Sequence, residues 1–325
     1  MSDLFETQNE VTQDDCDTYA QNLVKSSVTP IPWQGFHSYT LRSNSGLIIQ
    51  FRSKASPLDS STTKLAKQVH GHLAPATTYH GLMPNSSVSV WVMEIIAGIG
   101  YLFTASTITT AKLDITVTDF AKFYAASWEN PQPPAKDKIL LYTTKLKQLL
   151  TSLPPRFTKI FKNAQENIGL LIDLVPWVLT HQDLSGMNIL VDPHTGHITG
   201  VVDWADATIE PFGMALWGLE SVLGCSGLNG WSYFGSDPSY LHFGCSPSRL
   251  RKLFWETLLR EIECTISDEC RYAVNEVRTL GVLLRYGFRW ENGTMSPVKD
   301  TTYFDVFLKD ELKLADESYG SERTD

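Results

Sequence analysis

The polar residues whose types and spacing best suit chemistry lie between positions 181 and 203. Asp183 stands five residues before Asn188, and an apolar hairpin follows that ends in Asp203. A hairpin that returns Asp203 to the side of Asn188 brings a carboxylate and an amide oxygen together, and hard oxygen ligands of this kind suit Mg²⁺. Asp183 projects from the same loop, where a hydroxyl nucleophile would lie. The pattern predicts phosphoryl transfer, which needs metal ions, a proton acceptor and tight positioning.

Short apolar strands are expected to hold these residues. Residues 188–191 form the first strand of the hairpin, residues 192–196 its turn and residues 198–202 its second strand. Alternating apolar segments around a turn that contains Pro and Gly are typical of such a hairpin. Together with a strand at residues 177–180 they predict a compact β insert within a mainly helical region.

Two other interpretations of this region are weaker. A lone His181 and Asp183 would be a loop pair, and Asp203 alone would be a solvated carboxylate at a strand end. The coincidence with the hairpin and its other polar positions argues against this reading. A metal hydrolase that uses His181 with His194 and His197 is also disfavoured, because the latter two flank a Thr-Gly turn and are expected to be exposed.

The remaining elements predict an α+β fold with two lobes. The first part is β-rich and contains two helices, whereas the second is mainly helical. Expected strands cover residues 38–42, 47–52 and 89–93, and expected helices cover residues 12–25, 60–73, 117–128, 138–153 and 156–174. We expect a nucleotide-binding lobe at residues 1–95 and a catalytic and substrate-binding lobe at residues 96–325.

The motif H-x-D-x-x-x-x-N, followed by a hairpin and an aspartate, resembles the catalytic core of the aminoglycoside phosphotransferase and choline kinase family. The resemblance extends over about residues 30–310, and residues 34–41, 207–220 and 277–290 look like fungal members of the family. It implies a protein kinase-like fold that uses ATP and Mg²⁺. It also implies that Asp183 is the catalytic base, that His181 braces the loop, and that Asn188 and Asp203 bind Mg²⁺.

The same resemblance predicts a departure in the first lobe. In the family, a lysine on the third strand holds the phosphates and pairs with a glutamate of the next helix. Here Gln50 or Arg52 takes the place of the lysine, and the two share one face of the strand. Residues 60–73 contain no acidic residue, so the ion pair is predicted to be missing.

Two further segments are assigned through the resemblance. Gln34 and Gly35 belong to a loop that could cover the phosphates with backbone N–H groups. The backbone of Glu94 and Ile96 matches the hinge that hydrogen-bonds adenine. Both segments are expected to bind the nucleotide.

Composition limits the partners. The chain has 325 residues, 27 basic and 36 acidic, with a formal charge of −9 and no basic run, which argues against nucleic acid and anionic membranes. Five scattered cysteines show no C-x-x-C pair, as expected in a reducing compartment. No signal peptide or membrane span is apparent, so a cytoplasmic location is expected.

The acceptor is expected to be a hydroxylated small molecule. A polycationic aminoglycoside requires a dense group of carboxylates, whereas Asp206, Glu210, Glu220 and Asp237 are spread over more than thirty positions. Large aromatic residues are frequent after Asp203. We therefore expect a partly aromatic or terpenoid-like secondary metabolite.

Two alternatives remain open. A catalytically weak or dead kinase-like binding protein would explain the missing lysine–glutamate pair, but not the complete catalytic loop. A kinase fold reused for non-phosphoryl chemistry in a biosynthetic pathway is also possible, because a fold does not fix a function. A protein kinase is disfavoured, since no A-P-E segment follows Asp203 and the loop lacks the arginine of H-R-D.

Overall fold

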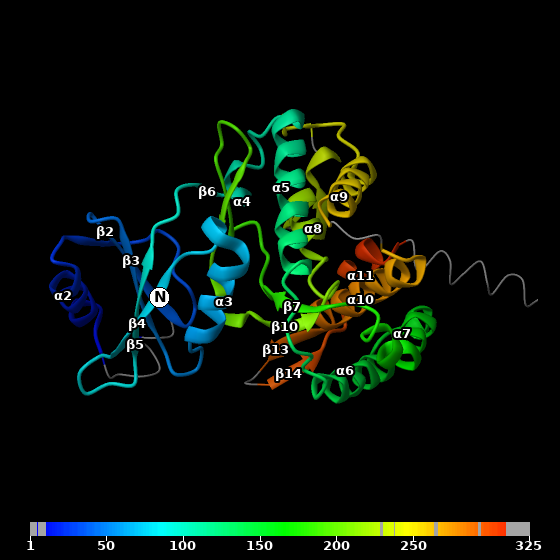
Figure 1. Ribbon diagram of the computed structural model, residues 1–325, viewed down its shortest axis with the longest axis horizontal. Coiled ribbons are helices and arrows are strands. Elements are labelled where there is room, and N and C mark those ends of the chain that lie inside the picture. Colours follow the sequence, from blue (N-terminus) through cyan, green and yellow to red (C-terminus); the bar gives the residue numbers. More distant parts are fainter. Residues whose placement is uncertain are drawn as a thin grey trace, which may run out of the picture.

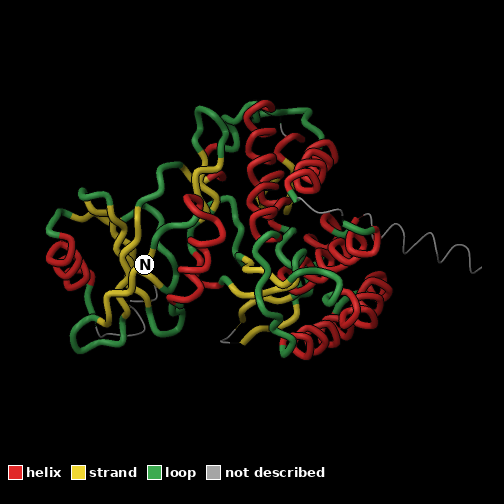
Figure 2. Tube along the Cα trace, viewed as in Figure 1, coloured by secondary structure: helices red, strands yellow, loops and turns green. Residues whose placement is uncertain are grey.

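The computed structural model describes residue 5 and residues 11–227, 230–236, 238–262, 266–291 and 294–309. A β-rich lobe lies beside a larger, mainly helical lobe, as the colouring along the chain in Figure 1 and the strands and helices in Figure 2 show. The predicted two-lobed α+β architecture is confirmed. None of the described helices has the length and apolar character needed to cross a membrane.

The first lobe is built on one antiparallel sheet in the order β1-β2-β3-β5-β4. The bounds are β1 Val28–Pro30, β2 Ser38–Ser43, β3 Leu47–Arg52, β4 Thr77–Leu82 and β5 Ser89–Glu94. Alternation along β3 buries Ile49 and Phe51 against helix α2 (Gln13–Val24). Gln50 and Arg52 therefore lie on the opposite face, which is turned toward the second lobe.

Helix α3 (Ser60–His70) lies between the sheet and the helical lobe in Figure 1. The Asp59 side chain caps its first turn by accepting a hydrogen bond from the N–H of Thr62 at 2.7 Å. A 3₁₀ turn, Gly71–Leu73, extends the helix to the end that the sequence predicted. At this end His70 stacks on Phe123 of the second lobe, with ring centroids 4.1 Å apart.

The second lobe contains several helices around one large apolar core. Its helices are α4 Tyr101–Thr104, α5 Thr110–Trp128, α6 Lys138–Ser152, α7 Thr158–Leu171, α8 Gly218–Leu223, α9 Pro247–Glu261, α10 Asp268–Tyr286 and α11 Thr302–Phe307. The long helix α5 runs through the centre and packs along α9. Helix α10 crosses below them and contacts α6, α7 and α11.

Small sheets in the second lobe position the polar motif. Strand β6 (Ile99–Gly100) pairs with β8 (Ile189–Val191), which pairs with β9 (Ile198–Val201). Strand β7 (Trp177–Thr180) pairs with β10 (Thr208–Pro211). The hinge segment after β5 is therefore joined through β6 to the predicted hairpin.

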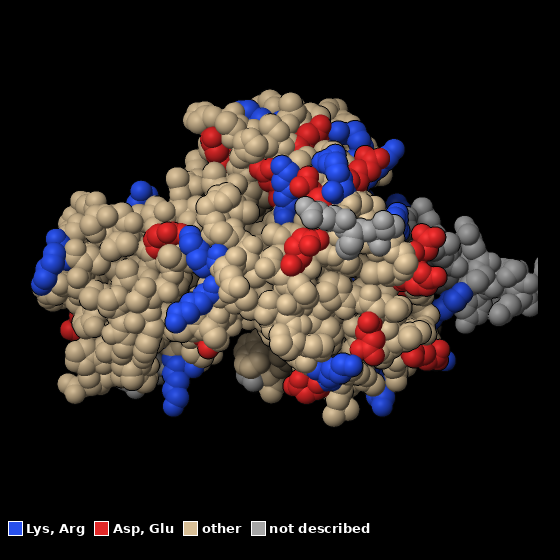
Figure 3. Space-filling model, in the orientation of Figure 1, with Lys and Arg blue, Asp and Glu red and all other residues tan. Residues whose placement is uncertain are grey.

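Two further hairpins stand farther along the chain. They are β11 (Gly224–Gly227) with β12 (Gly230–Tyr233), and β13 (Phe288–Glu291) with β14 (Thr294–Pro297). Figure 3 shows acidic and basic side chains interspersed on one face of the molecule, without a large patch of one sign. This face accordingly offers no continuous basic surface of the kind that binds nucleic acid.

Helix α10 is held close to the chain before α8 by a glycine. A Cβ at Gly281 would collide with the carbonyl oxygen of Met214, whereas a Cβ at Gly169 in α7 would meet nothing within 4 Å. We predict that Gly281→Ala lowers the free energy of unfolding by about 1–3 kcal/mol through overpacking. Gly169→Ala should raise it by about 0.5–1 kcal/mol, because alanine is the better helix former. Urea unfolding of both variants measures this, and equal effects would contradict the close approach of α10.

Candidate active site

The loop between β7 and β8 places Asp183 and Asn188 in direct contact. The Asn188 Nδ2 donates to the Asp183 carbonyl oxygen at 2.8 Å and to its Oδ2 at 2.9 Å. An ionised carboxylate only accepts hydrogen bonds, so the amide nitrogen must face Asp183. The Asn188 Oδ1 is thereby directed away from the carboxylate and is left for another partner.

His181 fastens the start of this loop to the hairpin. Its Nε2 donates to the Val202 carbonyl oxygen at 2.9 Å, and its Nδ1 accepts from the Asp183 N–H at 3.1 Å. These two contacts specify a neutral imidazole with the proton on Nε2. Burial lowers the pKa of the ring, which is 2% exposed, and this also favours the neutral form. The contacts are those of a bracing residue.

Asp203 follows β9 with a left-handed backbone, at φ 63° and ψ 64°. Few residues other than glycine adopt this conformation, and aspartate is among those that tolerate it. Trp204 fixes the turn by donating from Nε1 to the Val201 carbonyl oxygen at 2.8 Å. The Asp203 side chain is 47% exposed, and its Oδ1 lies 3.6 Å from Nη1 of Arg52. A half-exposed carboxylate thus projects between the lobes.

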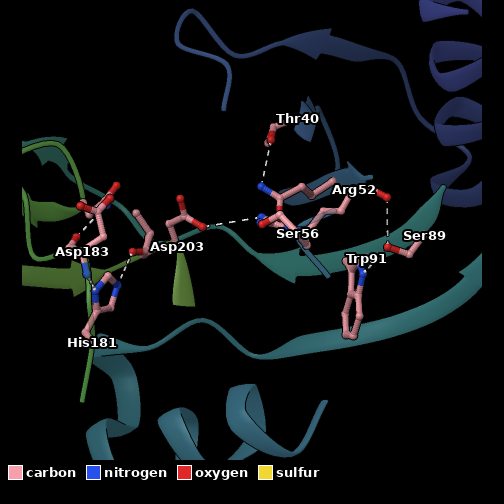
Figure 4. Close-up of polar contacts among 11 residues, drawn as sticks. Thr40, Arg52, Ser56, Ser89, Trp91, His181, Asp183 and Asp203 are labelled. Atoms are coloured by element: carbon pink, nitrogen blue, oxygen red, sulfur yellow. Dashed lines mark hydrogen bonds and ion pairs between the residues drawn. The ribbon is translucent and has the colours of Figure 1, made fainter. Parts of the chain in front are cut away.

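Arg52 is a buried cation held by neutral acceptors (Figure 4). Its Nε donates to the Ser56 carbonyl oxygen at 2.8 Å and its Nη2 to the Ser56 Oγ at 2.7 Å. Its Nη1 donates to Gln50 Oε1 at 2.9 Å, and the Gln50 Nε2 donates to Thr40 Oγ1 at 3.1 Å. Burial lowers its pKa and Asp203 opposes this shift, but a guanidinium stays charged. Arg52 therefore supplies the charge on β3, and Gln50 orients it.

Helix α3, which follows β3, forms an ion pair that differs from the predicted family's lysine–glutamate pair. Lys67 of α3 pairs with the Glu94 side chain and donates to the Ala74 carbonyl oxygen at 3.0 Å. The Lys67 contact lowers the pKa of Glu94. The Glu94 N–H donates to the Ala76 carbonyl oxygen at 3.0 Å. Within the described residues the Ile96 N–H has no protein acceptor, so it is a free donor in the segment after β5.

The loop between β1 and β2 is closed by the side chain of Gln34. Its Nε2 donates to the carbonyl oxygens of Ile31 and Thr40, both at 2.9 Å, and its Oε1 accepts from the Thr40 N–H at 2.7 Å. The Gln34 side chain thus hydrogen-bonds both the N–H and the carbonyl oxygen of Thr40 in β2. Of the predicted phosphate-covering loop, Gly35 and the backbone around it remain open to a ligand.

Most of the predicted residues surround a single cavity of about 420 Å³ between the lobes. This volume is within the usual range for small-molecule sites. Seven predicted residues line it, namely Gln34, Gly35, Gln50, Glu94, Ile96, Asn188 and Asp203. Apolar side chains, including Met93 and Leu190, form part of its wall. At its edge Trp33 of the first lobe stacks on Phe103 of α4, with ring centroids 5.7 Å apart.

The donor groups fit the predicted magnesium ion. Asn188 and Asp203 line the same cavity, and each has an oxygen without a hydrogen-bond donor in the described structure. Two protein oxygens are sufficient for Mg²⁺, which usually retains water and binds substrate phosphates. By contrast, His194 and His197 are exposed, as predicted. No three His, Cys, Asp or Glu side chains of the described ranges are grouped for a shared metal.

Comparison with known proteins connects this geometry to a family. The sequence profile of the "Phosphotransferase enzyme family" matches residues 121–224, which include the catalytic loop and the hairpin. The GDP complex of a mutant aminoglycoside 2′-phosphotransferase IIIa superimposes with a TM-score of 0.54 at 15% identity, covering 96% of this chain and 99% of the other. The predicted resemblance to the aminoglycoside phosphotransferase family is confirmed over the matched residues.

Two more solved structures are similar to the chain. ADP-bound aminoglycoside phosphotransferase APH(2″)-Ib gives a TM-score of 0.49 at 15% identity, over 94% of this chain and 97% of the other. Aminoglycoside phosphotransferase APH(3″)-Id from Streptomyces rimosus gives 0.48 at 12% identity, over 82% and 98%. No curated protein sequence matches the chain. The predicted kinase-like fold is confirmed, and the fungal affinity stays a prediction.

The sequence did not indicate one residue that lies at the centre of this candidate site. Arg285, near the end of α10, donates from Nη2 to Asp183 Oδ1 at 2.9 Å. Its guanidinium also lies over the ring of Trp217, 5.1 Å from the centroid. The contact joins positions 102 residues apart. No local pattern in the sequence could have indicated it.

A second cavity, of about 920 Å³, lies in the helical lobe and is lined by none of the predicted site residues. The buried Glu220 carboxylate accepts from Arg251 Nη2 at 2.7 Å and from Arg278 Nη2 at 3.4 Å. Aromatic residues that were candidates for an acceptor pocket separate into two groups. Phe212, Trp217, Phe234 and Phe254 are core, each at most 2% exposed, whereas Trp231, Tyr233 and Trp255 are less buried and line this cavity. Asp237 lies outside the described residues.

A buried histidine beside Asp203 makes stability depend on pH. His70 packs between Phe123 and Trp204, and burial lowers its pKa to about 3. An unfolded histidine has a pKa of about 6.5, so below that pH the unfolded chain takes up the proton first and the folded protein is destabilised. His70→Leu should therefore reduce the loss of unfolding free energy between pH 7.5 and pH 5 by about 2 kcal/mol.

Urea unfolding at the two pH values measures this effect. The same substitution at the exposed His72 is the control and should leave the pH dependence as it is in the wild type. An unchanged pH dependence in His70→Leu would mean that His70 is not neutral in the folded protein.

Proposed function

We propose that the protein is an ATP-dependent phosphotransferase that acts on a hydroxyl group of a small molecule. The observation that carries the proposal is the arrangement of Asp183, Asn188 and Asp203 beside the cavity between the lobes. Asn188 binds the base through its nitrogen and keeps its oxygen for a metal ion. The division into a nucleotide-binding lobe at residues 1–95 and a catalytic lobe at residues 96–325 belongs to this proposal, and β5 ends at Glu94.

The nucleotide would occupy the cavity of 420 Å³ with its base at the hinge. The Ile96 N–H is the donor for adenine. Arg52 provides a fixed positive charge for the phosphates, aimed from β3 toward Asp203. Asn188 and Asp203 would hold Mg²⁺, which when bound neutralises charge on the phosphate oxygens.

Transfer then requires one proton acceptor. Asp183 takes the proton of the acceptor hydroxyl while that oxygen forms a bond to the γ-phosphorus. The bond from the γ-phosphorus to the bridging oxygen breaks, and ADP leaves with the electron pair. His181 keeps the loop in position through the Val202 carbonyl, and the hydrogen bond from Asn188 orients the carboxylate.

The acceptor is proposed to be a hydroxylated metabolite without several positive charges. Two carboxylates that could have received ammonium groups are already neutralised inside the protein. Glu210 pairs with Lys138 at 2.8 Å and with Tyr142, and Glu220 pairs with Arg251. These groups hold the helical lobe together and are not offered to an aminoglycoside.

The test is release of ADP from Mg·ATP in the presence of a panel of hydroxylated metabolites. Asp183→Asn should lower turnover by ~10²–10⁴ and still be stabilised against heat by Mg·ATP. Asp203→Ala should lose both turnover and this stabilisation. Asp173→Asn, an exposed position paired with Lys136, is the control and should resemble the wild type.

The outcomes separate the alternatives. A thermal shift without ADP from any acceptor would identify a kinase-like binding protein. The absence of both a thermal shift and ADP release would favour non-phosphoryl chemistry. Retention of more than about a third of the wild-type rate in Asp183→Asn would remove that residue as the base, since a positioned base contributes far more.

The phosphate-binding role of β3 gives a separate prediction. Arg52→Met should raise the KM for ATP about tenfold or more, because a charge-assisted contact contributes ~1.5–3 kcal/mol. The KM for ATP of Arg52→Lys should lie between those of the wild type and Arg52→Met. Gln50→Ala should raise the KM less than Arg52→Met does, because Gln50 orients Arg52. Lys64→Met on the exposed side of α3 is the control. An unchanged KM in Arg52→Met would show that β3 does not contact the phosphates.

A further inference from the structure

The carboxylate of Asp183, the proposed base, is paired with Arg285. This arginine is not among the residues proposed to bind the nucleotide or the metal ion. Arg285 Nη2 lies 2.9 Å from Asp183 Oδ1, the oxygen that Asn188 does not use. The side chains of Arg285 and Asp183 are 43% and 38% exposed. The contact is therefore open to solvent and to an arriving acceptor.

Arg285 has hydrogen-bonding capacity left for a ligand. A guanidinium has five N–H donors in a fixed fork, and among the described residues only the bond to Asp183 uses one of them. Its plane is supported by the buried ring of Trp217, which holds it without supplying a counter-charge. A supported, half-exposed guanidinium with free donors suits a carboxylate, which it can bind through two parallel hydrogen bonds.

The other arginines of this region are already paired. Arg278, two helical turns before Arg285 on the same face of α10, and Arg251 both contact the buried Glu220. Arg289 pairs with Glu291. Arg285 differs from these in that its only ion pair in the described structure is with the residue proposed as the base.

The position of the acceptor follows from the chemistry. A hydroxyl that gives its proton to Asp183 must come within about 2.6–3.2 Å of that carboxylate. The atoms bonded to the hydroxyl carbon then lie next to the Arg285 guanidinium. An ammonium group there would be repelled, whereas a carboxylate would gain charge-assisted hydrogen bonds.

We propose that Arg285 is an acceptor-binding residue and that the acceptor has a carboxylate next to its reacting hydroxyl group. The proposal rests on the phosphotransferase function and names the acceptor class for the same site. Binding of such a hydroxy acid also gives Arg285 a second anionic partner. This loosens its hold on Asp183 Oδ1 as the hydroxyl arrives there.

The test uses three small probes that share a phenyl ring and a hydroxyl group and differ in charge. They are mandelate with a carboxylate, mandelamide as its neutral counterpart, and 2-amino-1-phenylethanol with an ammonium group, all with the hydroxyl on the carbon that bears the ring. Their binding to the full chain with Mg·ADP is measured by ligand-observed NMR titration. We expect mandelate to bind about tenfold or more tightly than mandelamide, and the amine to bind most weakly.

The variants separate charge from mere positioning of the base. Arg285→Gln should abolish the preference for mandelate over mandelamide, and Arg285→Lys should retain part of it, since lysine keeps the charge without the fork. Arg289→Gln is the matched control and should retain the full preference. Equal binding of mandelate and mandelamide to the wild type, including no detectable binding of either at millimolar concentration, would overturn the proposal. So would a preference that survives in Arg285→Gln.

Failure of this proposal is distinguishable from failure of the proposed function. Stabilisation by Mg·ATP and release of ADP from a neutral acceptor would leave the phosphotransferase function intact while removing the carboxylate requirement. Absence of any Mg·ATP effect would instead contradict the phosphotransferase function itself.

Discussion

The buried guanidinium of Arg52 is the interaction on which the relation between the two lobes depends. A cation that is 4% exposed is costly to bury unless its N–H groups are satisfied. Ser56 and Gln50 satisfy it with neutral oxygens, so its charge is oriented without being cancelled. Asp203 of the other lobe is the carboxylate that the described residues bring within salt-bridge distance. A buried positive charge on β3 therefore faces a carboxylate of the second lobe at 3.6 Å.

This arrangement changes what helix α3 has to do. The helix need not supply a glutamate to orient a cation on β3, because β3 and the loop after it do so themselves. Its Lys67 instead binds Glu94 at the hinge, and His70 at its other end packs against Trp204 beside Asp203. Helix α3 is thus fastened both to the hinge and to the second lobe, and it sets how the sheet lies over the catalytic loop.

The sequence was sufficient wherever the contacts are local. The alternation in β3, the helix α3 and the hairpin between Asn188 and Asp203 were all predicted, because each depends on neighbours in the chain. Strand β10 was missed, since its four residues include Glu210 and a proline and show no apolar alternation. The sequence itself shows that α3 has no acidic residue, but the pairing of its Lys67 with Glu94 was not predicted. The pairing of Lys67 with Glu94 depends on how the helix lies against the sheet, which no periodicity encodes.

The charges of the helical lobe explain why the surroundings of Asp183 could not be predicted either. Counting carboxylates along the sequence treats Glu210 and Glu220 as available, yet both are buried and matched by cations. A buried carboxylate without such a partner would be strongly destabilising, so these pairs are fixed by folding and not by the ligand. Arg285 lies beside Asp183 and, among the described residues, pairs with no other carboxylate. Because Arg285 belongs to α10, a substitution there changes the charge beside Asp183 without changing the sequence of the loop that carries Asp183 and Asn188.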